Sequence, residues 1–94
     1  MFVGIVRVEL HLPGAASLKD KRAVVRALKD RIRSRTAAAV AEVDHADLWQ
    51  RASLGVAIVT GSAEGLGTLL SDLRDIVERQ HDVTVLDWSV RHYE

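Results

Sequence analysis

The spacing of apolar and polar residues predicts an alternation of strands and helices along the chain. Residues 2–12 alternate, with apolar side chains on one side and Arg7, Glu9 and His11 on the other, which is typical of a half-buried strand. From Ser17 to Arg35 apolar residues recur at intervals of three and four, which predicts an amphipathic helix of about five turns. Ser17 is its predicted N-cap, and Asp20 completes a weak capping box.

The second half of the chain predicts a strand, a helix and a further strand. Leu54–Thr60 is a short, nearly continuous apolar run, as in an interior strand. Over about Ser62–Gln80 apolar residues recur at helical spacing behind Ser62, which predicts a second, capped helix. The last strand is predicted over about Val83–Tyr93. A change of its apolar register between Val85 and Leu86 predicts a bulge there.

The segment Ala37–Val43 is ambiguous when taken alone. Its alanines favour a helix, whereas Val40, Glu42 and Val43 approach the alternation of a strand. A strand at this position completes the order βαββαβ, which is the ferredoxin-like arrangement. The sequence therefore predicts a single α+β domain over residues 1–94, with a four-stranded antiparallel sheet and two helices on one face.

Three local motifs carry a resemblance to a known family. They are His11-Leu-Pro followed by Ser17-Leu-Lys-Asp-Lys-Arg22, then Ala41-Glu-Val-Asp44 with Asp47-Leu-Trp-Gln-Arg-Ala52, and then Gly55-Val-Ala57. The chain resembles the YlxP-like family, a small bacterial domain of unknown function. The resemblance implies the same ferredoxin-like fold and a translation- or ribosome-related setting. It implies no catalytic residues.

Charge is distributed very unevenly along a chain whose net charge is zero. Residues 17–35 carry eight Lys or Arg against two Asp, so the predicted first helix is net +6 and the remainder is net −6. Five of these cations recur at alternating spacings of three and four and so share one side of the helix. We call this set the basic stripe: Lys19, Arg22, Arg26, Lys29 and Arg33.

The basic stripe predicts a surface for RNA phosphate or for an acidic protein partner. Cations in the first helical turn are disfavoured by the helix dipole unless an anion is held there, and the helical angle of Lys21 falls within the apolar face. The predicted phosphate contacts are Ser17, Lys19, Lys21, Arg22, Arg26, Lys29 and Arg33. Two simpler interpretations stay open: a solvated flank, or pairing with acidic residues of the second helix, namely Glu64, Asp72, Asp75 and Glu78.

Other chemistry finds little support in the sequence. The absence of cysteine excludes disulfides and thiolate sites, and no metal-ligand spacing or cofactor motif is present. The acidic stretch Glu42–Asp47 and the glycine-rich stretch Gly61–Gly67 are interpreted as turns. The acylphosphatase site of this fold needs an Asn, which the chain lacks. Base stacking of the RRM type needs aromatic residues on central strands, and Leu54–Thr60 has none.

The sequence therefore favours a cytoplasmic, non-enzymatic binding module without cofactor, metal or membrane span. An alternative is a homodimer formed through the open sheet face or an edge strand. A further alternative is an enzyme acting on a phosphorylated small molecule at the start of the first helix. Trp49 and Arg51 are candidate interface residues, because Trp and Arg are enriched at binding hot spots; packing of Trp49 over the edge of the core is the other interpretation.

Overall fold

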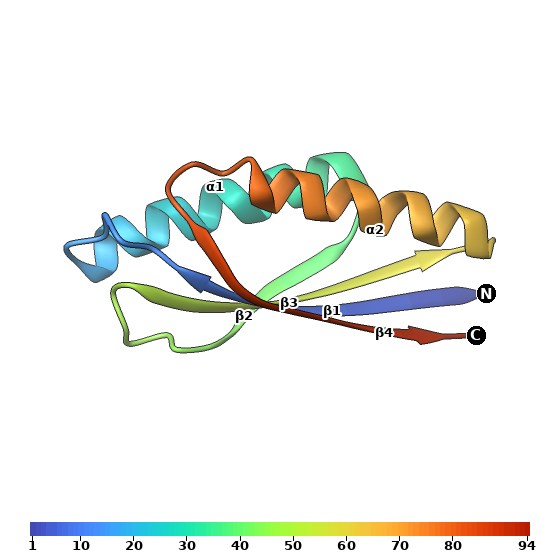
Figure 1. Cartoon of the computed structure of the whole chain (residues 1–94), viewed down its shortest axis with the longest axis horizontal. Coiled ribbons are helices and arrows are strands. Elements are labelled where there is room, and N and C mark those ends of the chain that lie inside the picture. Colours follow the sequence, from blue (N-terminus) through green and yellow to red (C-terminus); the bar gives the residue numbers. More distant parts are fainter.

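Four strands and two helices alternate in the computed structural model, which describes residues 1–94. The elements are β1 (Phe2–His11), α1 (Leu18–Thr36), β2 (Ala39–Asp44), β3 (Arg51–Thr60), α2 (Ala63–Glu78) and β4 (Thr84–Tyr93). The strands form one sheet in the order β2-β3-β1-β4, with every neighbouring pair antiparallel. Both helices lie on the same face of this sheet (Figure 1). The predicted ferredoxin-like α+β fold is confirmed.

The core lies between the sheet and the two helices. Alternate residues of β1 (Val6, Val8 and Leu10) are buried and pair across the sheet with alternate buried residues of β3. Leu28 and Ile32 of α1 complete the core together with apolar residues of α2. The period of two in the strands and of about 3.6 in the helices therefore brings one apolar side of each element into the same interior.

The start of α1 is capped as the sequence predicts. The Ser17 hydroxyl accepts a hydrogen bond from the Asp20 N–H at 3.0 Å. The Asp20 carboxylate in turn accepts from the Ala16 N–H at 2.9 Å, so the reciprocal bond goes one residue further back than in the usual capping box. At the other end Ala37 takes a left-handed conformation, with φ 53°. Ala37 is therefore the helix cap, and β2 begins at Ala39 and not at Ala37 as predicted.

Two strand boundaries differ from the prediction because backbone pairing extends past the apolar run. β3 begins at Arg51, three residues before Leu54, because His11 pairs with Arg51 and Glu9 with Ser53 along β1. These added positions include polar residues, so hydrophobicity alone could not reveal them. The final strand begins at Thr84, one residue later than predicted.

Two bulges shape the sheet. In the β1–β4 ladder Glu9 pairs with Asp87 and Leu10 with Val85, so Leu86 is the extra residue of the predicted bulge and lies exposed. In the β2–β3 ladder Val43 is the extra residue between two paired positions. This second bulge was not predicted, and it bends the end of β2 just before the loop that leads to β3.

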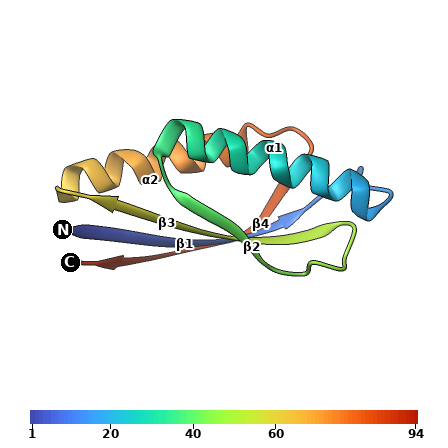
Figure 2. The ribbon, with the colours of Figure 1, turned by 180° about the vertical axis from the view of Figure 1, so that it is seen from behind.

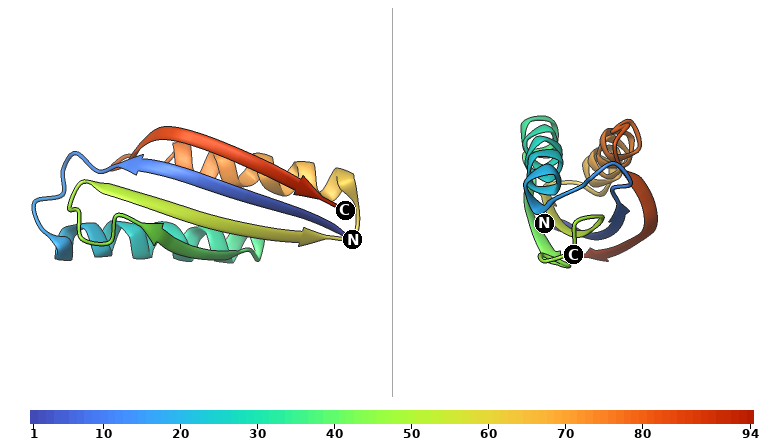
Figure 3. Two further views of the ribbon diagram at one scale, coloured as in Figure 1. Left: turned by 90° about the horizontal axis from the view of Figure 1, so that it is seen from below. Right: turned by 90° about the vertical axis from the view of Figure 1, so that its left-hand side faces the viewer.

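The molecule is elongated, with extents of 42 × 19 × 18 Å. Both chain termini lie at one end, and the start of α1 and the loop over residues 45–50 lie at the other (Figures 1 and 3). The view from behind shows α1 running along the side of the sheet that β2 closes (Figure 2). Neither helix combines the length and the hydropathy needed to cross a bilayer.

Candidate functional site

The basic stripe lies on the solvent-facing flank of α1. Lys19, Arg22 and Arg26 are exposed, and Lys29 is partly exposed. None of these four cations takes part in any ion pair or side-chain hydrogen bond of the structure. Four positive charges are thus presented to solvent along roughly 15 Å of helix, at 1.5 Å per residue.

Arg33, the fifth member of the stripe, fixes the direction in which this flank points. Its Nη2 donates to the carbonyl oxygen of Val40 at 3.0 Å, and its Nη1 lies 3.7 Å from a carboxylate oxygen of Asp30. Val40 belongs to β2, which is an edge strand. The basic stripe therefore runs along the side of α1 that adjoins the outer edge of β2.

The acidic residues of α2 do not neutralise the stripe. Glu78 pairs with Arg74 on the same helix at 2.7 Å, and Glu64, Asp72 and Asp75 form no ion pair. Those two aspartates face the opposite flank of α1, where they line a groove with Arg31 and Arg35. The interpretation of the stripe as one half of an interhelical ion-pair array is therefore wrong.

Lys21, a predicted phosphate contact, is buried in the protein interior. Its side chain is 1% exposed, and its ammonium nitrogen donates to the carbonyl oxygens of His45 at 2.7 Å, Ala46 at 3.2 Å and Arg51 at 3.2 Å. A carboxylate oxygen of Glu42 lies 2.8 Å from the same nitrogen. This explains the position of Lys21 within the apolar face of α1: the ammonium crosses the core edge and fastens the β2–β3 loop. The Lys21 ammonium contacts four protein oxygens and is buried, so it is not accessible to an external phosphate.

The Ser17 hydroxyl is also used within the protein, as the N-cap of α1. Gln50 forms hydrogen bonds with the segment just before this helix. The Gln50 side-chain amide donates to the carbonyl oxygens of Pro13 at 3.3 Å and Ala15 at 3.2 Å. The backbone carbonyl of Gln50 accepts from the Leu12 N–H at 2.9 Å. The first two motifs of the sequence, one at the start of α1 and one in the β2–β3 loop, therefore interlock. Lys21 within the apolar face was the one signal in the sequence for this contact.

The fastened loop presents two apolar side chains to solvent. Trp49 is 54% exposed and Leu48 is 47% exposed, so packing of Trp49 over the core edge is not what the structure shows. Arg51, the other predicted interface residue, begins β3, and its Nη2 lies 3.8 Å from a carboxylate oxygen of Glu9. Trp49 and Arg51 therefore lie close in sequence but make different contacts, one with solvent and one with the sheet.

A cluster of polar side chains surrounds Glu9 on the sheet face that the helices leave open. One carboxylate oxygen of Glu9 accepts from Arg7 Nε at 2.9 Å, and the other accepts from the buried Ser53 hydroxyl and lies 3.6 Å from His45 Nε2. Asp44 accepts from the His45 N–H at 2.7 Å and lies 3.4 Å from Arg7 Nη2. Sequence reasoning missed this cluster, because its members come from three separate segments of the chain.

These contacts lower the pKa of both carboxylates. The hydrogen bond from Ser53 is the largest cause for Glu9, followed among the favourable causes by Arg7, and burial opposes them. For Asp44 the backbone N–H of His45 comes first, with the charges of His45 and Arg7 adding to it. The pKa of Arg7 is raised, chiefly by its hydrogen bond to Glu9. The cluster therefore favours the ionised form of each of these side chains.

Because the pKa values of these carboxyl groups are lowered, we expect the stability of the fold to decrease as the pH falls into the acidic range. A carboxyl group whose pKa is lower in the folded state stabilises the fold above its unfolded pKa, near 4, and this contribution is lost as the pH falls through the folded pKa. Glu9→Gln should therefore lower Tm at pH 7 and flatten the decline of Tm below about pH 4. Thermal unfolding followed by circular dichroism between pH 7 and pH 2 measures this, with Glu94→Gln as the control. An unchanged acid profile in Glu9→Gln would contradict it.

The bulge at Val43 separates two carboxylates that simple alternation places together. Glu42 pairs with Leu54, whose side chain is in the core, whereas Asp44 pairs with Ser53, which faces the open side. Glu42 accordingly contacts Lys21 on the helix side, while Asp44 contacts Arg7 on the other. No three His, Asp or Glu side chains are arranged so that they could hold a metal ion.

Comparison with known proteins gives the chain a family. Residues 3–90 match a family described as a protein of unknown function, DUF503. The chain is also 29% identical over 90 residues to the uncharacterized protein YlxP of Bacillus subtilis (strain 168), an alignment that covers 92% of this chain and 98% of that protein. The resemblance drawn from the three local motifs is confirmed. The chain belongs to the DUF503 family of proteins of unknown function, in which it is similar to YlxP.

Proposed function

We propose that this protein is a binding module whose α1 flank holds the phosphate backbone of RNA. The observation that carries the proposal is the set of four solvent-facing cations, Lys19, Arg22, Arg26 and Lys29, for which the fold supplies no counter-charge. Unpaired Lys and Arg side chains in a row are the electrostatic footprint of a phosphate-binding surface. Arg33, held by the Val40 carbonyl, extends the row at a fixed orientation.

The proposed contact is with the backbone and not with the bases. No aromatic side chain lies in β3, and the single aromatic residue of β1, Phe2, packs against the core. The sheet therefore lacks the central stacking platform with which RRM domains read single-stranded bases. Binding through the basic stripe would be electrostatic, with steep salt dependence and little preference among sequences.

The direct test measures the affinity of the protein for a short labelled RNA by fluorescence anisotropy as salt is raised. With about four phosphate contacts on a single strand, the affinity should fall roughly a hundredfold between about 50 and 300 mM salt. Absence of binding at low salt would overturn the proposal. If polyglutamate bound at low salt and RNA did not, an acidic protein would take the place of RNA as the partner.

A second candidate function, self-association through the open sheet face, is favoured by a separate observation. Ile5, Val43, Val59 and Tyr93 are each 44–63% exposed, and the sheet around the first two forms a shallow apolar hollow of about 310 Å³. The polar part of this face includes side chains of both signs, such as Arg7 and Glu9. A second copy could therefore cover it without the like-charge repulsion that two basic stripes would meet.

Light scattering at micromolar concentration measures this association. We expect a dimer that Ile5→Asp converts to a monomer, because a charge at the centre of an apolar contact is costly to bury. Val59→Asp should act in the same direction, whereas Trp49→Asp, at the far end of the molecule, should leave the mass unchanged. A monomer in the unmodified protein at every concentration would exclude the open face as a dimer contact.

A further inference from the structure

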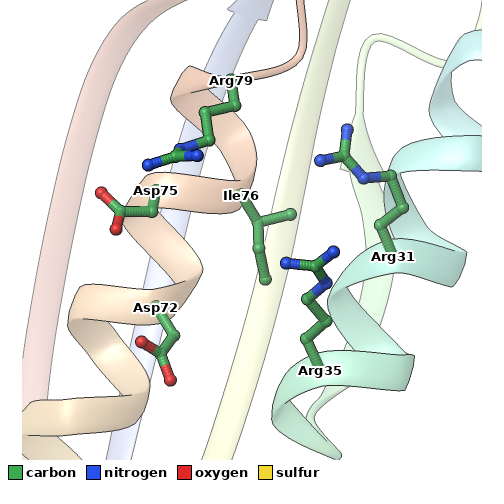
Figure 4. A pocket seen from close by; sticks show the side chains of 6 residues that line it. All are labelled: Arg31, Arg35, Asp72, Asp75, Ile76 and Arg79. Carbon is green, nitrogen blue, oxygen red and sulfur yellow. The ribbon is translucent and has the colours of Figure 1, made fainter.

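A groove between the two helices gathers three arginines that the proposed RNA surface does not use. Arg31 and Arg35 extend into it from α1, and Arg79, at the end of α2, lines it with its guanidinium group turned toward Asp75 (Figure 4). Ile76 forms its floor, and the cavity volume is about 430 Å³. The groove lies on the flank of α1 opposite the basic stripe, because positions 31 and 35 fall on the other side of the buried residues Leu28 and Ile32.

Arg31 is held in place within this groove. Its Nη1 donates to the side-chain oxygen of Gln80 at 2.5 Å, and Gln80, itself buried, donates to a carboxylate oxygen of Asp82 at 2.7 Å. One guanidinium nitrogen is thereby fixed, while the remaining N–H groups stay available to the groove. Such anchoring lowers the entropy that a ligand contact would otherwise cost.

The other two arginines have donors that nothing in the protein uses. Neither the Arg35 nor the Arg79 side chain makes a hydrogen bond or ion pair. Asp72 and Asp75 line the same groove (Figure 4), yet no carboxylate oxygen of either lies within the 4.0 Å of an ion pair with these arginines. The groove is therefore lined by three guanidinium groups and two carboxylates that form no ion pairs with one another.

We infer that this groove is a binding site for a phosphoryl group attached to a hydroxylated carrier. Guanidinium groups bind phosphate oxygens through paired N–H donors, and three of them, contributed by two helices, line this groove. The two carboxylates limit the site to one phosphoryl group, because a second would be repelled, and they can accept hydrogen bonds from carrier hydroxyls. With Ile76 as the one apolar residue of the lining, the groove offers little to an apolar or aromatic carrier. The inference is independent of the RNA surface, which uses none of these residues.

The test is an NMR titration of the ¹⁵N-labelled protein with ribose 5-phosphate, with ribose and inorganic phosphate as companion ligands. We expect saturable shifts at Arg35, Ile76 and Arg79 with a dissociation constant of about 1 mM or below, weaker binding of inorganic phosphate, and none of ribose. The double variant Arg35→Gln/Arg79→Gln should weaken binding about tenfold or more. Both side chains are exposed, so the fold should tolerate the change.

Two comparisons make the test specific. The matched control Arg22→Gln/Arg26→Gln changes two exposed arginines of the opposite flank and should leave the affinity for ribose 5-phosphate within about twofold, since distant sites act independently. Asp72→Asn/Asp75→Asn should tighten the binding of inorganic phosphate, which has no carrier hydroxyls, by removing the repulsion between the carboxylates and the anion. Equal losses of ribose 5-phosphate affinity in both arginine variants, weaker binding of inorganic phosphate after neutralising the aspartates, or no saturation by ribose 5-phosphate up to about 50 mM would each overturn the site.

The source of the phosphoryl group is resolved with oligonucleotides. A three-nucleotide RNA carrying a 5′-phosphate is compared with the same RNA carrying a 5′-hydroxyl. The site is assigned to an RNA end if the groove residues bind the 5′-phosphate RNA more tightly than both the 5′-hydroxyl RNA and ribose 5-phosphate. It is assigned to a small phosphorylated metabolite if ribose 5-phosphate binds more tightly than the 5′-phosphate RNA. The RNA surface on the other flank is judged separately, because loss of RNA affinity in Arg22→Gln/Arg26→Gln is measured on residues that the groove does not contain.

Discussion

Replacing Lys21 with methionine is expected to lower the free energy of unfolding by about 3 kcal/mol, since breaking a buried ion pair on one side leaves the partner uncompensated. Methionine keeps most of the length of the side chain and its apolar stem. It removes the ammonium that serves three backbone carbonyls and the Glu42 carboxylate. Those oxygens would remain in a poorly hydrated place without a donor, which is the costly state of a polar group.

For a domain of this size such a loss corresponds to a fall in Tm of roughly 15 °C. Thermal and urea unfolding measure it, with Lys19→Met as the matched control. Lys19 lies two residues earlier on the same helix and is exposed, so its replacement should change stability by less than about 0.5 kcal/mol. Equal stabilities of the two variants would contradict the role assigned to Lys21. Hydrogen exchange should also show faster exchange of the β2–β3 loop in Lys21→Met, because the loop loses its attachment.

Reversing three charges of the basic stripe is expected to abolish RNA binding at low salt. The triple variant Arg22→Glu/Arg26→Glu/Lys29→Glu removes three of the four unpaired cations and adds three negative charges beside the RNA. Each lost phosphate contact with a single strand should reduce the salt slope by about 0.7, and the affinity at about 50 mM salt should fall at least a hundredfold. The side chains lie on the solvent-facing flank, so circular dichroism should report an intact fold.

Single charge reversals at two different places distinguish the effect of position on RNA binding from the effect of net charge. Arg26→Glu and Arg91→Glu change the net charge by the same amount, and both residues are exposed, but Arg91 lies in β4 on the opposite edge of the sheet from β2. Arg26→Glu should weaken RNA binding about tenfold or more, and Arg91→Glu should weaken it less than threefold. Similar losses in the two variants would show that net charge, and not the stripe, governs binding.

Most of the fold could be predicted because its elements carry strong local patterns. The alternation around Arg7 and Glu9, the cap at Ser17 and the register change near Leu86 each follow from short-range rules that the structure obeys. Boundaries were less accurate where backbone pairing, and not hydrophobicity, decides the end of a strand, as at Arg51. The strand over Ala39–Asp44 could be predicted from the order of elements, since its alanines gave no clear local signal.

The site was less predictable because its decisive contacts join distant segments. Lys21 meets carbonyl oxygens 24 to 30 positions further along the chain, and no periodicity encodes such a pairing. The bulge at Val43, which places Glu42 and Asp44 on opposite faces of the sheet, has no signal in the local sequence pattern. The spacing alone places the basic stripe on one flank of the helix. Whether acidic residues of α2 pair with it depends on how α1 and α2 pack, which the spacing does not encode.

The separation of charge also makes the molecule an electric dipole. The helix α1 carries most of the Lys and Arg side chains and lies on the side of the molecule that β2 closes (Figure 2), whereas the rest of the chain is net negative. A molecule of zero net charge whose positive and negative charges were evenly mixed would approach a polyanion in no preferred orientation. Here the field of a polyanion exerts a torque that turns α1 toward it before contact, so encounters begin in the productive orientation. The sequence isoelectric point of about 6.9 therefore says little about how this protein behaves near a charged polymer.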